Sequence, residues 1–223
     1  MGYLEAAVVV YLRAALGLAP ELVGAGDDVM RQATVGTFLP AEVAREAATL
    51  VMIAAVGWLA GRSRVERLAW AAVVFGIWDI IYYAGLWILL GWPESPGTWD
   101  VLFLIPATWV GPVIAPVGVS VALIGFGLAV ARRLRAGRQL RLGRARLLAV
   151  VGGGALVVVS FLVDGDRVLA GELGPWSGWP IYAAGMTIGI VSAAGAFRVG
   201  SARLPAGQDS GSAAGGPARG GGE

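Results

Sequence analysis

The chain has 223 residues, of which 57% are hydrophobic and only 14% charged, and its formal net charge is +2. Soluble domains carry about 25% charged residues, so this composition indicates contact with lipid rather than a water-facing globule. The chain contains no Cys and no His. Zinc sites built on these residues, His-ligated haem and Cys-ligated iron–sulfur clusters are therefore excluded within it, and we expect neither a metal nor a cofactor.

Residues 3–19 form an apolar segment that is interrupted by Glu5 and Arg13. The segment lacks the basic start and the small-residue cleavage site of a removable signal peptide. It either crosses the membrane as a sixth span or leaves the chain with five spans and an external N-terminus. We favour six spans, because the N-terminus then stays on the side where the chain is made.

Five further apolar segments are long enough to cross about 30 Å of hydrocarbon as helices. They cover residues 43–60, 68–90, 112–131, 147–163 and 180–197. The sequence therefore predicts an all-α, polytopic membrane helix bundle with five to six transmembrane helices. Residues 1–204 form a single transmembrane domain, and residues 205–223, which are mostly Gly, Ala and Ser, form a disordered tail.

The apolar stretch 101–131 is too long for one span, because a single helix of that length would extend about 46 Å. Pro106, Pro112 and Pro116 offer a break in it. We predict a Pro-broken segment over residues 101–119, with a half-helix or re-entrant piece at 101–110 that begins at a cap on Thr98 or Asp100.

Arginine is distributed unevenly among the loops. Thirteen Arg residues lie in the loops 62–67 and 132–146 and in the tail, but only two lie in the segments 20–40, 91–100 and 164–179. The positive-inside rule places the first set and the C-terminus in the cytoplasm. All basic residues are Arg, and Lys and Asn are absent, which favours a GC-rich bacterial source and hence the bacterial inner membrane. The seven-Arg loop 132–146 is also compatible with nucleic acid, but we expect no such partner.

Asp79 lies near the centre of the span 68–90, eleven residues from either end. An ionisable group at that depth costs about 2.5–3.5 kcal/mol to insert and is a functional candidate by default. Tyr82 and Tyr83 follow at helical spacing on the same face, and Trp78 and Trp109 are the deeper tryptophans. These five residues form a candidate buried polar site. The alternative is a structural lock, in which Asp79 bonds to a tyrosine or a backbone carbonyl and joins two helices.

A second candidate site is a polar cluster at the outer face, made of Arg45, Glu46, Glu94 and Asp100. These residues come from separate segments that all end near the outer boundary. Paired carboxylates there are suited to acid–base chemistry. Ordinary interfacial helix ends explain the same residues more simply.

Gly185 and Gly189 are four residues apart in the last span. Small residues at this spacing allow two helices to approach closely, so we expect a homo-oligomer or a membrane protein partner to pack there, in addition to the lipid bilayer. The alternative is that the spacing is accidental, since the chain contains 35 Gly.

Three sequence patterns together resemble a family of uncharacterised bacterial multi-pass membrane proteins. They are Arg45-Glu-Ala-Ala-Thr-Leu-Val-Met, Trp78-Asp-x-x-Tyr-Tyr and Leu90-Gly-Trp-Pro-x-Ser-x-x-Thr-Trp-Asp-x-Leu-Phe-Leu-Ile-Pro. The resemblance covers about residues 43–118 and implies a membrane location but no activity. The Trp-rich five-helix proteins that bind tetrapyrroles have similar span and Trp counts, but their Trp-Pro-Pro pattern is missing from this chain, so no ligand is transferred.

Three functions follow as hypotheses. The first is a protein that binds or passes a small molecule or a proton at a buried polar site around Asp79, and it requires a cavity that reaches this residue. The second is a structural or assembly subunit of a membrane complex, which requires close-packed helices and an exposed small-residue face. The third is a membrane enzyme that uses paired carboxylates on a lipid-like substrate, which requires two carboxylates in one cleft.

Overall fold

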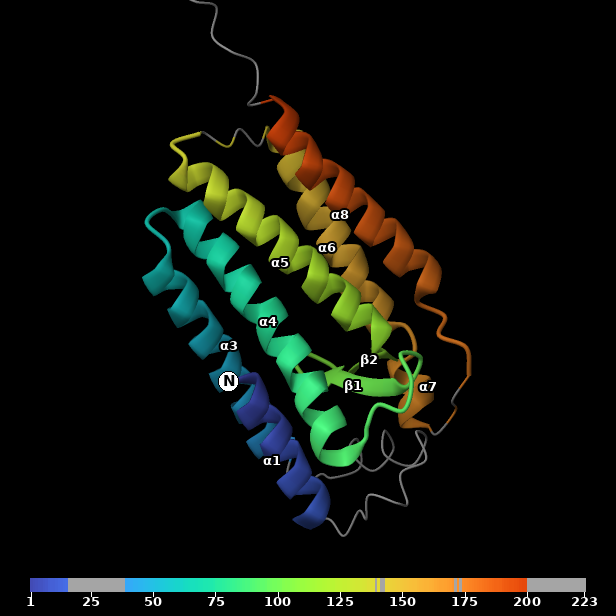
Figure 1. Ribbon diagram of the computed structural model, residues 1–223. Helices are drawn as coiled ribbons and strands as arrows, with labels where there is room; N and C mark the ends of the chain where they lie inside the picture. The colour runs from blue at the N-terminus through green and yellow to red at the C-terminus, as the bar shows by residue number, and fades with distance from the viewer. Residues whose placement is uncertain (16–38, 139, 141–142, 171, 173, 200–223) are drawn as a thin grey trace, which may run out of the picture.

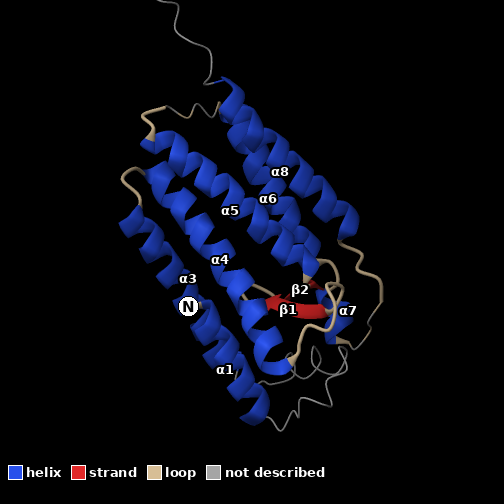
Figure 2. Ribbon diagram, viewed as in Figure 1, coloured by secondary structure: helices blue, strands red, loops and turns tan. Residues whose placement is uncertain are grey.

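A computed structural model describes residues 1–15, 39–138, 140, 143–170, 172 and 174–199 of the chain. They form a helix bundle with one short β-hairpin (Figures 1 and 2). Within this described part, five helices are long and apolar enough to cross a membrane. They are α3 (Leu39–Ala60), α4 (Arg64–Leu90), α5 (Ile114–Arg135), α6 (Arg144–Leu162) and α8 (Trp179–Val199). The predicted fold class is confirmed, and each of the five predicted spans falls on one of these helices.

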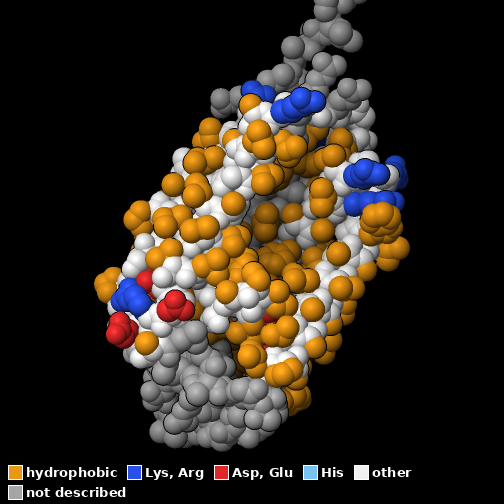
Figure 3. Space-filling view, turned by 180° about the vertical axis from the view of Figure 1, so that it is seen from behind, with side chains coloured by type: hydrophobic (Ala, Val, Ile, Leu, Met, Phe, Trp, Pro, Cys, Tyr) orange, Lys and Arg blue, Asp and Glu red, His pale blue; other side chains and the backbone are white. Residues whose placement is uncertain are grey.

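Large apolar side chains are exposed along these helices instead of being hidden in a core. Leu59, Leu68 and Ile88 are more than two thirds exposed, and hydrophobic side chains cover most of the face shown in Figure 3. Soluble monomers rarely expose apolar patches larger than a few hundred Å². The exposed belt is therefore a lipid-facing surface, and the chain is a membrane protein.

The two ends of the bundle differ. The hairpin end holds the β-hairpin and the short helix α7 (Gly165–Leu169), whereas the arginine end holds the turns at 61–63 and 136–138 and the end of α8 (Figure 1). At the arginine end Ser63 caps α4 by accepting from the Glu66 backbone N–H at 3.2 Å. The Glu66 carboxylate accepts from the Arg62 N–H at 3.0 Å and from Arg135 Nε at 2.9 Å. These bonds join the start of α4 to the end of α5.

Helix α1 (Gly2–Ala15) is shorter than a membrane span. Its 14 residues extend about 21 Å, and it packs along the half of α4 nearer the hairpin end. A Cβ on Gly2 would meet the Trp78 carbonyl at 2.4 Å, and a Cβ on Gly85 would meet that of Ala6 at 2.8 Å. The sixth span predicted over residues 3–19 is not among the candidate spans of the described residues; residues 16–19 and the predicted tail 205–223 lie outside them.

The segment 99–112 is a β-hairpin, so the prediction of a half-helix over 101–110 is wrong. Strand β1 (Trp99–Phe103) pairs antiparallel with β2 (Trp109–Pro112), with Val101 opposite Val110. β-Branched and aromatic residues favour strands, and Pro106 interrupts a helix but is tolerated in the connection between the strands.

The cap predicted for that half-helix is absent as well. Asp100 lies within β1, and its carboxylate accepts a hydrogen bond from the Tyr83 hydroxyl. The break itself is confirmed, since α5 begins only at Ile114. Pro116 falls in the first turn of α5, where a missing N–H costs no helical hydrogen bond.

The spans pack as two groups. α4 packs along α1, α3 and α5, and α6 packs along α8, whereas contacts between α5 and the α6–α8 pair are sparse. Glycines permit the close approaches: a Cβ on Gly153 would lie 2.7 Å from the Gly185 carbonyl and 2.8 Å from the Gly189 N–H. Gly185 therefore serves the contact between α6 and α8 inside one chain, whereas a Cβ on Gly189 would meet nothing within 4 Å. A partner packed at these glycines stays a prediction.

Candidate functional site

A cavity of about 620 Å³ lies between the two groups of helices. Its walls come from α4 and α5 on one side and from α6 and α8 on the other, and the β-hairpin borders its end. Figure 3 shows a hollow with hydrophobic side chains around it in the middle of the lipid-facing surface. The hairpin residues Leu102, Phe103 and Trp109 line the cavity, so the hairpin that replaced the predicted half-helix forms part of the site.

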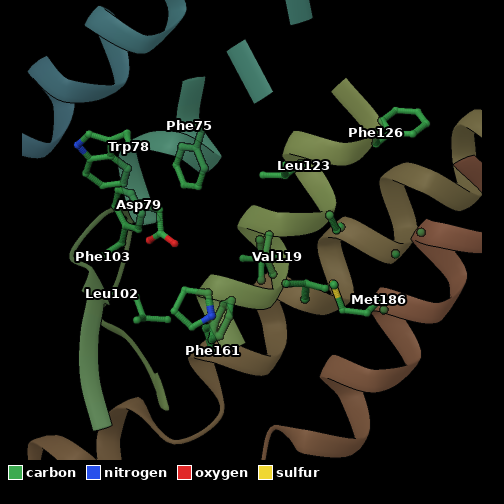
Figure 4. A pocket seen from close by; sticks show the side chains of 18 of the residues that line it. Phe75, Trp78, Asp79, Leu102, Phe103, Val119, Leu123, Phe126, Phe161 and Met186 are labelled. Atoms are coloured by element: carbon green, nitrogen blue, oxygen red, sulfur yellow. The ribbon is translucent and has the colours of Figure 1, made fainter. Parts of the chain in front are cut away.

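Asp79 borders this cavity and is 7% exposed. The Ser120 hydroxyl of α5 donates to Asp79 Oδ2 at 2.7 Å. Gly76 makes this contact possible, because a Cβ at that position would lie 2.6 Å from the Ser120 carbonyl. In Figure 4 the carboxylate points from α4 toward Val119 and Leu123. Asp79 thus faces the interior of the bundle, as the sequence predicts. Its carboxylate is hydrogen-bonded to Ser120 and also borders the open space of the cavity.

The tyrosines next to Asp79 act differently from the predicted network. The Tyr83 hydroxyl donates to Asp100 Oδ2 at 2.9 Å, so it ties α4 to the hairpin instead of bonding to Asp79. Tyr82 lines the cavity and stacks on Trp78 with ring centroids 6.2 Å apart. Both side chains therefore support the wall around Asp79.

Aromatic rings continue this wall toward the hairpin and across to α6. Phe103 lies 6.1 Å from Trp78 and 5.6 Å from Trp109, measured between ring centroids. Trp109 in turn stacks on Phe161 of α6 at 6.3 Å. The predicted site residues Trp78 and Trp109 are thus on the cavity wall, connected through a hairpin residue that the sequence analysis did not select.

A charged network adjoins the cavity where α1 meets α3. Arg45 forms ion pairs with Glu5 and with Glu42, the latter at 2.6 Å. The Thr49 hydroxyl donates to Glu5 Oε2 at 3.0 Å, and both side chains are buried. Buried charges are tolerated when they are paired and hydrogen-bonded, so this network holds α1 on α3.

The predicted outer-face cluster does not form one site. Arg45 and Glu46 line the cavity, and Glu46 accepts from the Leu104 backbone N–H at 3.0 Å, which satisfies the end of β1. Asp100 instead bonds to Tyr83, and Glu94 is exposed in the turn before the hairpin. The hairpin separates these residues because it places Asp100 within β1 and Leu104, the partner of Glu46, just after the end of that strand.

Sequence reasoning missed three residues of the site. Ser120 had a usable signal, because it is the one hydroxyl in the apolar span 112–131. Glu5 also had one, since a carboxylate in an apolar helix needs a cationic partner and Arg45 is available. Thr49 had no such signal, because a threonine within a membrane span does not by itself indicate a functional site.

Two tryptophans on the cavity wall, Trp78 and Trp109, carry buried indole N–H groups that have no hydrogen-bond partner among the residues that the structure describes. In Figure 4 the ring nitrogen of Trp78 turns away from the Asp79 carboxylate. Within the described part of the chain, no group of three or more Asp or Glu residues is arranged to hold a metal ion.

The fold and the cavity define a class: a polytopic helical membrane protein with a mainly apolar cavity that is bordered by a buried carboxylate. Comparison with known proteins adds no name, because no family model, no curated protein and no solved structure matches the chain. The resemblance to a family of multi-pass membrane proteins stays a prediction.

Proposed function

We propose that this protein binds a small, largely apolar molecule in the cavity beside Asp79. The observation that carries the proposal is the cavity itself, about 620 Å³ in volume and bordered by a buried carboxylate. Ligand sites typically enclose about 300–1,000 Å³, with mostly apolar walls and a few polar groups that orient the ligand. The hypothesis of a buried polar site around Asp79 requires such a cavity.

The hypothesis of a structural subunit receives less support. It requires close-packed helices and an exposed small-residue face, but Gly185 is buried against Gly153 within the chain. The enzyme hypothesis keeps one supporting observation, because Glu46 and Asp79 line the same cavity. Both carboxylates accept hydrogen bonds within the protein, and a binding site explains them without a reaction.

We further propose that the protein resides in a bacterial inner membrane, with its arginine end in the cytoplasm. The uneven distribution of Arg supports this orientation. The hairpin end then faces outward, and Asp79 lies between the two surfaces. A ligand that reaches the cavity from the lipid needs no aqueous pathway.

The test is to purify the protein into lipid nanodiscs and identify retained small molecules by native mass spectrometry. Val119→Phe places a larger side chain into the cavity, whereas Val121→Phe changes a residue of the same helix that is 58% exposed. We expect the first variant to lose the retained molecule and the second to keep it. Retention of the same molecule by both variants, or none by the wild type, would refute binding in this cavity.

A further inference from the structure

We infer that the cavity accommodates a single-chain amphiphile with an uncharged hydroxyl head group, oriented with its head toward the hairpin end and its chain toward the arginine end. This inference rests on the proposed function and specifies the ligand class. It follows from the length of the cavity, from the position of its polar groups and from their charge.

The cavity is long and follows the helix axes. On α5 its lining residues run from Pro116 to Ala129, and on α8 from Gly185 to Phe197. At 1.5 Å per residue, each of these walls is about 18–20 Å long. One leaflet of a bilayer with about 30 Å of hydrocarbon is about 15 Å deep. The cavity is therefore a few ångströms longer than one leaflet is deep, and it can hold one extended hydrocarbon chain lying parallel to the lipid chains.

The polar lining groups lie at only one end and on one wall. All ionisable or hydroxyl-bearing side chains that border the cavity come from α1, α3 and α4: Glu5, Arg45, Glu46, Thr49, Asp79, Tyr82 and Tyr83. On α4 the lining residues run from Phe75 to Tyr83, and the polar ones, Asp79, Tyr82 and Tyr83, lie in the half nearer the hairpin end. The walls from α5, α6 and α8 carry only apolar residues and glycine, including Phe126 and Phe197 toward the arginine end. A ligand with one polar end fits this asymmetry, and a ligand polar at both ends does not.

The charges at the polar end disfavour an anionic head group. Three carboxylates line the cavity, those of Glu5, Glu46 and Asp79, against the single cation Arg45. Arg45 is already paired with Glu5 and with Glu42. A phosphate or a carboxylate brought to this end would face unneutralised like charge in a medium of low dielectric constant.

Hydrogen-bonding capacity selects a head group that both donates and accepts. A carboxylate offers about four acceptor positions, and Ser120 occupies one of those on Asp79. The buried Trp109 N–H, on the hairpin side of the cavity, has no acceptor within the described ranges of the chain. A buried N–H without a partner costs about 1–3 kcal/mol. A hydroxyl group can donate to Asp79 and can accept from a donor such as Trp109, whereas an ammonium group can only donate.

Entry from the lipid is compatible with the packing. Contacts between α5 and the α6–α8 pair are sparse, and the hollow in Figure 3 lies within the apolar belt of the protein. A long-chain alcohol dissolved in the bilayer therefore reaches the cavity sideways, with its chain already aligned along the helices.

The experiment measures equilibrium binding of radiolabelled hexadecanol to the protein in nanodiscs, with empty nanodiscs as the background. Competition by unlabelled decanol, hexadecanoate and hexadecylamine then ranks head groups and chain lengths. We expect saturable binding of hexadecanol, weaker competition by decanol because its chain fills less of the cavity, and the weakest competition by hexadecanoate because of its charge. If hexadecanoate or hexadecylamine competed with labelled hexadecanol more strongly than decanol does, the assignment of an uncharged head group would be overturned.

Two pairs of variants locate the ends of the ligand. Asp79→Leu should weaken hexadecanol binding about tenfold, which corresponds to one hydrogen bond to a charged group, whereas Asp79→Asn, which still accepts, should weaken it less. Ala129→Leu shortens the cavity at the arginine end and should weaken binding of hexadecanol but not of decanol. Ala184→Leu adds the same side chain at an exposed position of α8 outside the cavity and should change neither. Size-exclusion chromatography confirms that each variant is folded.

The outcomes separate this inference from the proposed function. If Val119→Phe abolishes binding of a retained apolar molecule, but the wild type shows no preference among chain lengths or head groups, the inference fails and the proposed function stands. If Val119→Phe affects no ligand at all, both fail. If the Ala129→Leu variant binds hexadecanol and decanol as the wild type does, the proposed orientation of the chain is wrong.

Discussion

The Ser120 hydroxyl donates to Asp79 Oδ2 at 2.7 Å, and it connects α5 to α4 where both side chains are buried. We predict that Ser120→Ala lowers the free energy of unfolding by about 0.6 kcal/mol, the average for interhelical hydrogen bonds in membranes, with an upper bound of about 1.7 kcal/mol. Unfolding in mixed micelles measures it. Ser160→Ala is the matched control, because that equally buried hydroxyl donates to a carbonyl of its own helix. If Ser160→Ala lowered the free energy of unfolding more than Ser120→Ala does, the hydrogen bond between the helices would not be what stabilises the fold.

Substitution of Asp79 separates its structural role from its role in binding. Asp79→Asn keeps the size and an acceptor for Ser120, so we expect unfolding close to that of the wild type. Asp79→Leu leaves the Ser120 hydroxyl without this acceptor, at a cost of about 1–3 kcal/mol. Removal of a buried charged group at membrane depth offsets part of that cost. Thermal unfolding of both variants in detergent measures the difference, and an asparagine variant less stable than the leucine variant would contradict this account.

The glycines of α6 provide a test in which neighbouring positions should respond with opposite sign. Gly153→Ala places a Cβ 2.7 Å from the Gly185 carbonyl, whereas nothing lies within 4 Å of a Cβ on Gly152. Overpacking typically costs about 1–3 kcal/mol, so Gly153→Ala should destabilise the protein. Gly152→Ala should leave it unchanged or stabilise it by up to about 1 kcal/mol, through helix propensity. Equal thermal stability of the two variants would argue against the packing of α6 on α8.

The arginine end offers a prediction about Glu66. Its carboxylate accepts from the Arg62 N–H and from Arg135, and it is 3% exposed. Glu66→Ala removes these bonds from the start of α4 and should lower the free energy of unfolding, as the loss of a helix cap does. Glu94→Ala, at an exposed position, should stay within about 0.5 kcal/mol of the wild type. Chemical denaturation of the two variants measures both values.

Reporter fusions test the orientation of the bundle. A fusion after residue 138, at the arginine end, should report the cytoplasm, and one after residue 96, before the hairpin, should report the outside. The reason is that thirteen Arg lie in the loops 62–67 and 132–146 and in the tail, whereas only two lie in the segments 20–40, 91–100 and 164–179. A phosphatase that is active only outside the cytoplasm serves as the reporter. Activity of the fusion at 138 would reverse the proposed topology.

Much of the architecture could be predicted from the sequence, because a bilayer imposes its thickness on any helix that crosses it. The predicted spans 43–60 and 68–90 end at the same residues as α3 and α4. The break before α5 also followed from local chemistry, since three prolines in one apolar stretch do not continue a helix. Asp79 could be expected to face the interior, because a carboxylate at mid-depth gains nothing from lipid.

The sequence by itself thus determined the class of protein, its five main spans and the burial of Asp79, since these depend on composition and on helical period alone. Only the tertiary structure decided that residues 99–112 pair as strands, that Ser120 is the partner of Asp79 and that Gly185 packs on Gly153. Each of these features joins segments far apart in the chain. Their energies depend on which backbones approach within a few ångströms, and the periodicity of a single segment carries no information about its neighbour.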